Sequence, residues 1–145
     1  MKAISEGKII GIDTMVFIYH LENHPVYSRI TERLFEGIEK AKYRAVTSFI
    51  TLLEILVKPK RERALKAVSD YRDLLLTFPN LTFLPLELKV SDLASTLRAE
   101  YPIRTPDAIQ IATAITGQAS VFITNDEQLK KVDKINILLL RELTK

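Results

Sequence analysis

Short apolar runs alternate along this chain with longer segments of helical periodicity, and this alternation limits the folds that the chain can adopt. The runs have the length of buried strands, and they occupy residues 9–12, 45–47, 81–86, 120–124 and 135–140. The segments between them show the apolar spacing of amphipathic helices, which predicts helices over residues 26–41, 48–57, 61–77, 88–100, 105–117 and 127–132. Strands joined by helical crossovers form parallel sheets that are covered on both faces. We therefore expect an α/β fold around a central, mainly parallel sheet of about five strands.

Prolines and glycines mark the expected ends of these elements. We expect Pro59 to stop the helix that starts at Ser48, because proline lacks the backbone donor that a helix interior needs. Thr105 is expected to cap the helix that has Pro106 at its first position. The chain has four glycines and six prolines and no linker-like stretch. We expect residues 1–145 to form a single domain.

The composition excludes several kinds of site. The chain has no cysteine, which rules out disulfides, thiolate zinc sites, iron–sulfur clusters and a cysteine nucleophile. Its histidines, His20 and His24, are too few for a multi-histidine centre, so oxygen ligands must dominate any metal site. The 21 basic and 18 acidic residues give a net charge of +3, which is compatible with nucleic acid binding without being diagnostic of it. The sequence shows neither a signal peptide nor a membrane-length apolar run, and we expect a soluble cytoplasmic protein.

Four acidic residues lie at or just beyond the ends of predicted strands. Asp13 follows the first strand, Asp126 follows the fourth, Asp107 lies in the first turn of the helix that opens with Thr105, and Glu54 lies in the helix after the second strand. Ligands of open parallel sheets bind at the carboxyl ends of the strands. Carboxylates gathered there would repel one another unless a cation neutralised them. Because oxygen ligands suit hard cations, the sequence predicts a Mg²⁺ or Mn²⁺ site.

Each acid also has an ordinary structural interpretation. Asp13, Asp107 and Asp126 could simply cap helices or favour their positive ends. Glu54 belongs to the one polar stripe of an otherwise apolar helix, and such a stripe either faces solvent or lines a cleft. The stripe consists of Thr47, Thr51, Glu54 and Lys58.

Four segments together resemble a known family. They read IIGIDTMVFIYHLE, TSFITLLEIL, TPDAIQIATAI and VFITNDEQL in chain order, and they resemble the PIN domain, in particular the VapC-type toxin ribonucleases. The resemblance extends from about Lys8 to Leu140. It implies a three-layer α/β/α fold, a homodimer and an antitoxin partner. It also implies Mg²⁺- or Mn²⁺-dependent hydrolysis of RNA, with the acidic site at Asp13, Glu54, Asp107 and Asp126.

The resemblance assigns further residues and a mechanism. Thr14 and Thr124 match the supporting hydroxyls of the family, and Asn125 neighbours the fourth acid. We expect one or two metal ions to orient the scissile phosphate and to activate a water for attack. Asp126 is expected to be a second-metal or outer ligand, because the other three acids already form a minimal site. The expected function is that of a metal-dependent endoribonuclease, the toxin of a type II toxin–antitoxin pair.

Basic and aromatic residues supply candidate contacts to RNA. We expect phosphate contacts from Lys58, Lys60, Arg61 and Arg104, with a solvated helix start as the alternative for the first three. Aromatic side chains stack on unpaired bases in many RNA complexes. The candidates for stacking are Tyr19, His20, Phe49 and Tyr101, although core packing is the expected role of Phe49.

Other folds and functions fit less well. A phosphoacceptor receiver domain needs an acidic pair after its first strand and an aspartate after its third, whereas residues 12–14 read Ile-Asp-Thr and residues 81–89 contain no aspartate. An aspartyl phosphatase needs Asp-x-Asp, whereas residues 13–15 read Asp-Thr-Met. A non-catalytic PIN-like module that binds RNA or protein stays open as the alternative.

Overall fold

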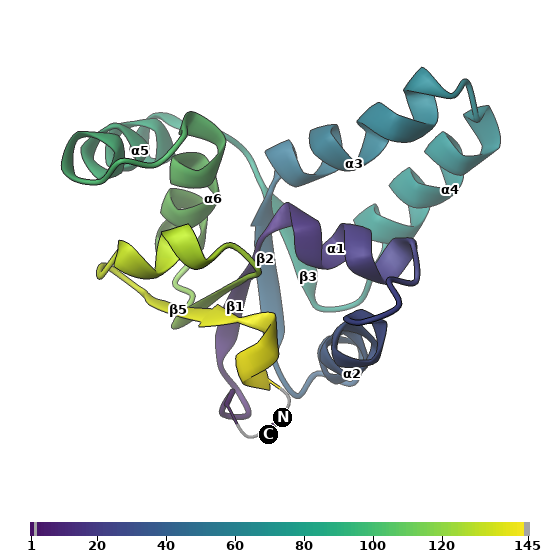
Figure 1. The fold of residues 1–145 in the computed structure, drawn as a ribbon, viewed down its shortest axis with the longest axis horizontal. Coiled ribbons are helices and arrows are strands. Elements are labelled where there is room, and N and C mark those ends of the chain that lie inside the picture. The colour runs from purple at the N-terminus through teal and green to yellow at the C-terminus, as the bar shows by residue number, and fades with distance from the viewer. Residues whose placement is uncertain (2, 144–145) are drawn as a thin grey trace.

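The protein forms an α/β structure in which helices cover both faces of one parallel sheet (Figure 1). The computed structural model describes Met1 and residues 3–143. Its strands are β1 (Ile9–Ile12), β2 (Arg44–Ser48), β3 (Leu81–Leu84), β4 (Val121–Thr124) and β5 (Asn136–Leu139). Its helices are α1 (Thr14–Leu21), α2 (Ser28–Glu39), α3 (Phe49–Arg61), α4 (Leu65–Leu76), α5 (Leu88–Glu100) and α6 (Thr105–Thr116), with two 3₁₀ helices, η1 (Glu127–Lys131) and η2 (Leu140–Leu143).

The sheet has the strand order β3-β2-β1-β4-β5, and every neighbouring pair is parallel. The chain builds outward from β1 through β2 to β3, and then returns to the other side of β1 to add β4 and β5. The order therefore reverses between β1 and β4, which is where open α/β sheets bind their ligands. The predicted α/β class and parallel sheet are confirmed.

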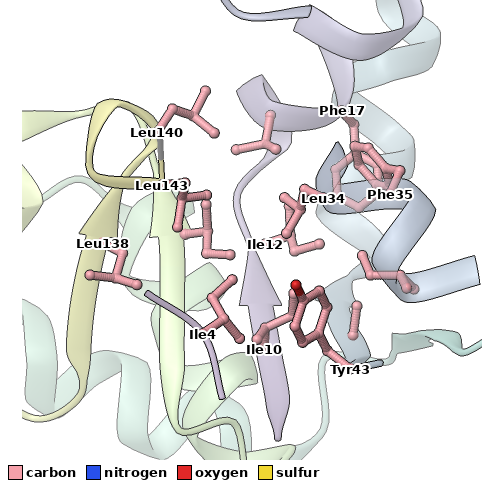
Figure 2. Close-up of a cluster of buried hydrophobic side chains, with 14 of the residues drawn as sticks. Ile4, Ile10, Ile12, Phe17, Leu34, Phe35, Tyr43, Leu138, Leu140 and Leu143 are labelled. Atoms are coloured by element: carbon pink, nitrogen blue, oxygen red, sulfur yellow. The ribbon is translucent and has the colours of Figure 1, made fainter. Parts of the chain in front are cut away.

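Each face of the sheet carries its own apolar core, which is why the strands read as continuous apolar runs. In β1, Ile10 and Ile12 point into a core shared with α1, α2 and η2, as Figure 2 shows. In β4, Phe122 points the other way, into the core under α5 and α6. The hairpin of α3 and α4 extends beyond the sheet (Figure 1).

Gly11 lets α6 lie directly on β1. A Cβ atom at Gly11 would stand 2.5 Å from the Cβ of Ala114 and 3.1 Å from the ring of Phe122. Since real side chains do not approach so closely, only glycine fits at this point of the strand.

One helix and two helix boundaries differ from the sequence prediction. Helix α1 was not predicted, because residues 14–21 (TMVFIYHL) are apolar on nearly every side and show no amphipathic stripe. Helix α3 continues through Pro59 to Arg61, because a proline in the final turn removes only one hydrogen bond and its ring is buried here. The expected helix over 61–77 begins only at Leu65, after a left-handed Arg63 (φ 55°).

Two residue roles also differ. Arg104 is the N-cap of α6, and Thr105 is its first helical residue, whose hydroxyl accepts a hydrogen bond from Arg98 Nη1 at 3.0 Å. The prediction that Thr105 caps this helix is therefore wrong. Phe49 is 43% exposed and packs beside Phe83 instead of entering the core.

Candidate active site

All four predicted acids line one cleft of about 500 Å³ at the carboxyl ends of β1 and β4. They reach it from different parts of the chain: Asp13 from the end of β1, Glu54 from α3, Asp107 from the start of α6, and Asp126 from the end of β4. The cleft is also lined by Thr14, Met15, Ile18, Tyr19, Arg104, Pro106, Gln110, Thr124 and Asn125. The strand order reverses at this edge of the sheet, so the fold brings together acids that are far apart in sequence.

Asp13 is the most enclosed of the four acids. Its Oδ1 caps α1 by accepting a hydrogen bond from the Thr14 N–H at 2.8 Å, and its Oδ2 accepts one from Thr124 Oγ1 at 2.7 Å. Burial raises the pKa of Asp13 to about 6. The two hydrogen bonds act against this rise, and the nearby charges of Asp107 and Glu54 add to it. The carboxyl therefore holds its proton at pH values where an exposed aspartate is ionised.

Asp107 lies in the first turn of α6 beside Arg104. The Arg104 Nε donates to its Oδ2 at 3.4 Å. Burial raises the pKa of Asp107, the Arg104 charge lowers it, and the Asp126 charge adds to the rise. The pKa values of Asp13 and Asp107 are thus raised mainly by burial, and the charges of neighbouring carboxylates add to the rise.

Glu54 is joined to Asp13 through Thr14. The Thr14 hydroxyl donates to Glu54 Oε1 at 2.6 Å, while the Thr14 N–H bonds Asp13. Of the predicted polar stripe, Thr47 belongs to β2 instead of α3, Thr47 and Thr51 are buried, and Glu54 reaches the cleft. The stripe therefore runs from the interior to the cleft wall.

Thr124, Asn125 and Asp126 line the cleft next to Asp13. The Asp126 N–H donates to Thr124 Oγ1 at 3.1 Å, and Asp126 Oδ1 caps η1 by accepting from the Gln128 N–H at 2.9 Å. Asn125 Nδ2 donates to the Tyr19 hydroxyl at 3.2 Å. Thr124 thus links Asp13 to the turn that holds Asp126.

The donor set of the cleft fits a hard divalent cation. Within residues 3–143 and Met1, no three acidic or histidine side chains stand close enough together to form a complete ligand cage. Mg²⁺ commonly uses only one or two carboxylates and completes its octahedron with waters, and the cleft offers carboxylate oxygens with room for waters. A cation would also remove the repulsion that contributes to the raised pKa values of Asp13 and Asp107.

The four basic candidates lie in three different places. Arg104 lines the acidic cleft. Lys58 lies on the rim of a neighbouring groove and pairs with Glu22 at 3.3 Å. Lys60 and Arg61 are exposed at the end of α3 and line neither cavity.

The aromatic candidates are also dispersed. Only Tyr19 lines the cleft, and its ring stacks on Tyr27 with the ring centres 5.1 Å apart. His20 packs against Phe35, and Tyr101 hydrogen-bonds Asp133. Phe49 lies outside the cleft lining.

Sequence reasoning missed Gln110, a buried polar residue of the cleft wall. It stands three positions after Asp107, and residues three apart share a helix face. A glutamine inside the apolar run AIQIATAI was the available signal.

A second cavity continues from the cleft. This α1–α3–α4 groove has a volume of about 410 Å³, and Ile18 and Glu54 line both cavities. Its remaining lining is mostly apolar and is formed by Leu21, Glu22, Ile55, Lys58, Pro59, Glu62, Ala64, Ala67 and Tyr71.

Comparison with known proteins identifies the family. The PIN domain model matches residues 10–135, and the chain therefore belongs to the PIN domain family. No curated protein gives a significant match.

Solved structures share the fold at low sequence identity. A chain of VapBC2 from Rickettsia felis, bound to a DNA fragment from its promoter, superposes with a TM-score of 0.73 at 19% identity, over 90% of this chain and 98% of that one. A chain of DNA-bound VapBC from Salmonella typhimurium gives 0.67 at 22% identity, over 92% and 98%. A chain of a toxin–antitoxin complex from Klebsiella pneumoniae gives 0.62 at 19% identity, over 92% and 98%.

The described helices include none that is long and apolar enough to cross a membrane.

Proposed function

We propose that this chain is a Mg²⁺- or Mn²⁺-dependent endoribonuclease and the toxin of a toxin–antitoxin pair. The observation that carries the proposal is the gathering of Asp13, Glu54, Asp107 and Asp126 in one cleft, with the pKa of Asp13 raised to about 6. Membership of the PIN family and the likeness to chains of VapBC and toxin–antitoxin structures support it.

In this proposal the chain's own residues hold the cation and the RNA. Asp13, Glu54 and Asp107 provide carboxylate oxygens, and Asp126 is the outer or second-metal ligand. A divalent cation bound there supplies positive charge for the scissile phosphate and lowers the pKa of an attacking water. Arg104, whose side chain is 81% exposed beside Asp107, is placed to donate to a phosphate oxygen. Below pH 6 the Asp13 proton competes with the cation, so activity should rise with pH through that region.

The proposed antitoxin would occupy the α1–α3–α4 groove. Apolar residues such as Ile18, Ile55 and Tyr71 suit an amphipathic segment. Glu22, Glu54 and Glu62 on the same lining suit basic side chains on that segment. Since Ile18 and Glu54 also line the acidic cleft, such a partner would reach the proposed active site.

A second copy of the chain is proposed to cover exposed apolar residues near the start of α3 and α5. Leu53 is 63% exposed, Leu86 53% and Leu88 86%. Phe49 precedes Leu53 by one helical turn, and it directly follows Ser48, which pairs with Leu84 at the end of β3. Exposed apolar clusters of this kind mark protein interfaces. We expect Leu53→Glu combined with Leu88→Glu to convert a dimer into a monomer in light scattering. A parent protein that is already monomeric at high micromolar concentration would contradict the dimer.

The activity is tested with the Asp13→Asn variant. We expect the parent to cleave labelled single-stranded RNA with Mn²⁺ and to stop when EDTA is added. Asp13→Asn should lose at least about 100-fold in rate, as expected when a ligand of a catalytic metal is lost. Asp92→Asn, which makes the same change of charge at an exposed position of α5, should cleave normally.

Expression in cells gives a second measurement. The parent should arrest growth and the Asp13→Asn variant should not, and sequencing of new RNA ends should then identify the target. RNA binding without any Mn²⁺-dependent cleavage by the parent would favour the non-catalytic module instead.

A further inference from the structure

Gln110 joins three helices beneath the acidic cleft. It is 3% exposed, and its Nε2 donates to Thr14 Oγ1 at 2.9 Å and to Thr51 Oγ1 at 2.7 Å. These hydroxyls belong to α1 and α3, and both are buried. The amide of α6 thus contacts the two helices that carry the Glu54 hydrogen bond.

The distances in this network indicate how its hydroxyl protons are arranged. Thr47 Oγ1 donates its single proton to the Ile12 carbonyl at 2.9 Å. In the 2.7 Å contact between Thr47 and Thr51, the donor is therefore Thr51. The Gln110 amide donates one proton to Thr14 and the other to Thr51. The Thr14 proton goes to Glu54 at 2.6 Å rather than to Thr51 Oγ1 at 3.3 Å, because the carboxylate is the closer and stronger acceptor.

The opposite orientation of the amide would break this arrangement. With Oε1 facing the threonines, Thr14 or Thr51 would have to donate to Gln110. Thr14 would then lose its proton for Glu54, or Thr51 would lose its proton for Thr47. The Thr14–Glu54 and Thr51–Thr47 bonds are therefore kept together only when Gln110 presents its NH₂ group to both threonines.

Packing alone does not account for an amide at this position. Gln110 Oε1 is buried and has no hydrogen-bond partner among the described residues. Burying an unpaired carbonyl oxygen is unfavourable compared with burying an apolar group of the same shape. A residue chosen only to fill this space would be apolar, so the two N–H bonds are what the glutamine provides.

We infer that Gln110 is a positioning residue for Glu54, acting through the Thr14 hydroxyl. This inference rests on the proposed function, in which Glu54 helps to hold the cation. By accepting the Gln110 N–H, Thr14 is fixed so that its own proton points to Glu54 Oε1. The carboxylate is thereby held in the cleft before the cation arrives, and residues that orient metal ligands in this way influence metal affinity strongly.

The test compares Mn²⁺ affinity in four variants. Gln110→Met keeps the length of the side chain and removes both donors. Thr14→Val removes the hydroxyl that carries the effect, and the double variant combines the two changes. Thr113→Val is the matched control, because this hydroxyl is also buried on α6 and has no partner among the described residues.

We expect Gln110→Met to weaken Mn²⁺ binding about 10-fold in calorimetry, which is the usual range for lost support of a metal ligand. The cleavage rate at saturating Mn²⁺ should fall much less than the affinity. The double variant should bind Mn²⁺ no more weakly than Thr14→Val alone, because without the hydroxyl Gln110 has no path to Glu54. Thr113→Val should bind as the parent does.

The outcomes separate the two proposals. If the parent binds Mn²⁺ and cleaves RNA while Gln110→Met has the same Mn²⁺ affinity, the positioning role is wrong and the function stands. A loss of unfolding free energy without a loss of affinity, or affinity losses that multiply in the double variant, would equally overturn it. If the parent binds no Mn²⁺, the proposed metal site fails and the inference fails with it. Gln110→Leu, another apolar residue of similar size, replaces Gln110→Met if that variant does not fold.

Discussion

Asp13 illustrates how a single residue can serve a site at the expense of the fold. Its carboxyl has an ordinary pKa of 3.8, and burial raises this to about 6. A carboxyl with a raised pKa in the folded state favours folding only while it is protonated. The folded state therefore loses stability as the pH rises from about 4 to about 6, and the loss persists above that range.

The direction of the Asp13 pKa shift leads to a prediction about stability. A rise in pKa from 3.8 to about 6 corresponds to about 3 kcal/mol in the free energy of unfolding. We expect Asp13→Asn to be more stable than the metal-free parent at pH 7 by up to about 3 kcal/mol, and to have no such advantage near pH 4. Urea unfolding at both pH values measures the difference between the two proteins. If Asp13→Asn is less stable than the parent at pH 7, the destabilisation does not come from this buried carboxyl.

At the scale of the elements, apolar runs and helical spacing in the sequence predict the strands and the amphipathic helices. Burial on both faces makes β1 and β4 nearly continuous apolar runs, and β2, β3 and β5 keep apolar stretches that predict a strand, although β3 is only partly buried. Helix α1 is also apolar on nearly every side, so no amphipathic stripe in the sequence distinguishes it from a strand or a loop. Pro59 predicts the end of a helix, whereas in the structure α3 continues through it to Arg61, because a proline in the last turn of a helix costs little.

The candidate site was predictable for the same kind of reason. Asp13, Asp107 and Asp126 lie next to strand or helix ends, where the sequence shows their position directly. Gln110 is different, because its role depends on Thr14 and Thr51, which lie 96 and 59 residues away. No local pattern reports a contact of that separation.

The contact between α6 and β1 gives a prediction for an element. Gly11→Ala would place a methyl group 2.5 Å from the Ala114 Cβ, so α6 must move away from the sheet. We expect a loss of about 1–3 kcal/mol in unfolding free energy, as for other overpacked cores. Mn²⁺ binding should weaken too, because Asp13 and Asp107 lie on the two displaced elements. Chemical denaturation and calorimetry check both effects, and Gly7→Ala, where a Cβ would meet nothing within 4 Å but φ is +81°, controls for the cost of backbone conformation alone.

At the scale of the whole molecule, charge is separated more than the net value of +3 suggests. Four of the 18 acidic residues and one of the 21 basic residues, Arg104, line one cleft, so 14 acidic residues and 20 basic residues are distributed elsewhere. A bound cation would cancel part of the acidic field. The proposed RNA substrate would then approach a surface on which basic residues outnumber acidic ones.

Salt dependence should show which basic residues contact RNA. Replacing a phosphate-binding residue lowers the slope of log K against log salt by about one. We expect this for Arg104→Ala, because Arg104 lines the cleft. Lys60 and Arg61 should contribute only if the RNA extends along α3, and Lys60→Ala/Arg61→Ala tests that path. Fluorescence anisotropy with Asp13→Asn as the background measures binding without cleavage. An unchanged slope in Arg104→Ala would exclude its phosphate contact.

The direct contact of α6 with β1 at Gly11 also bears on which ions the cleft can select. Asp13 lies two residues beyond Gly11, and Asp107 lies on the helix that rests on it. The backbone segments that carry these two carboxyls are therefore held together by the packing of α6 on β1. Mg²⁺ binds oxygen at about 2.0–2.1 Å and Ca²⁺ at about 2.3–2.6 Å with more ligands. In the proposed metal site, the packing of α6 on β1 at Gly11 would thus favour the smaller Mg²⁺ over Ca²⁺.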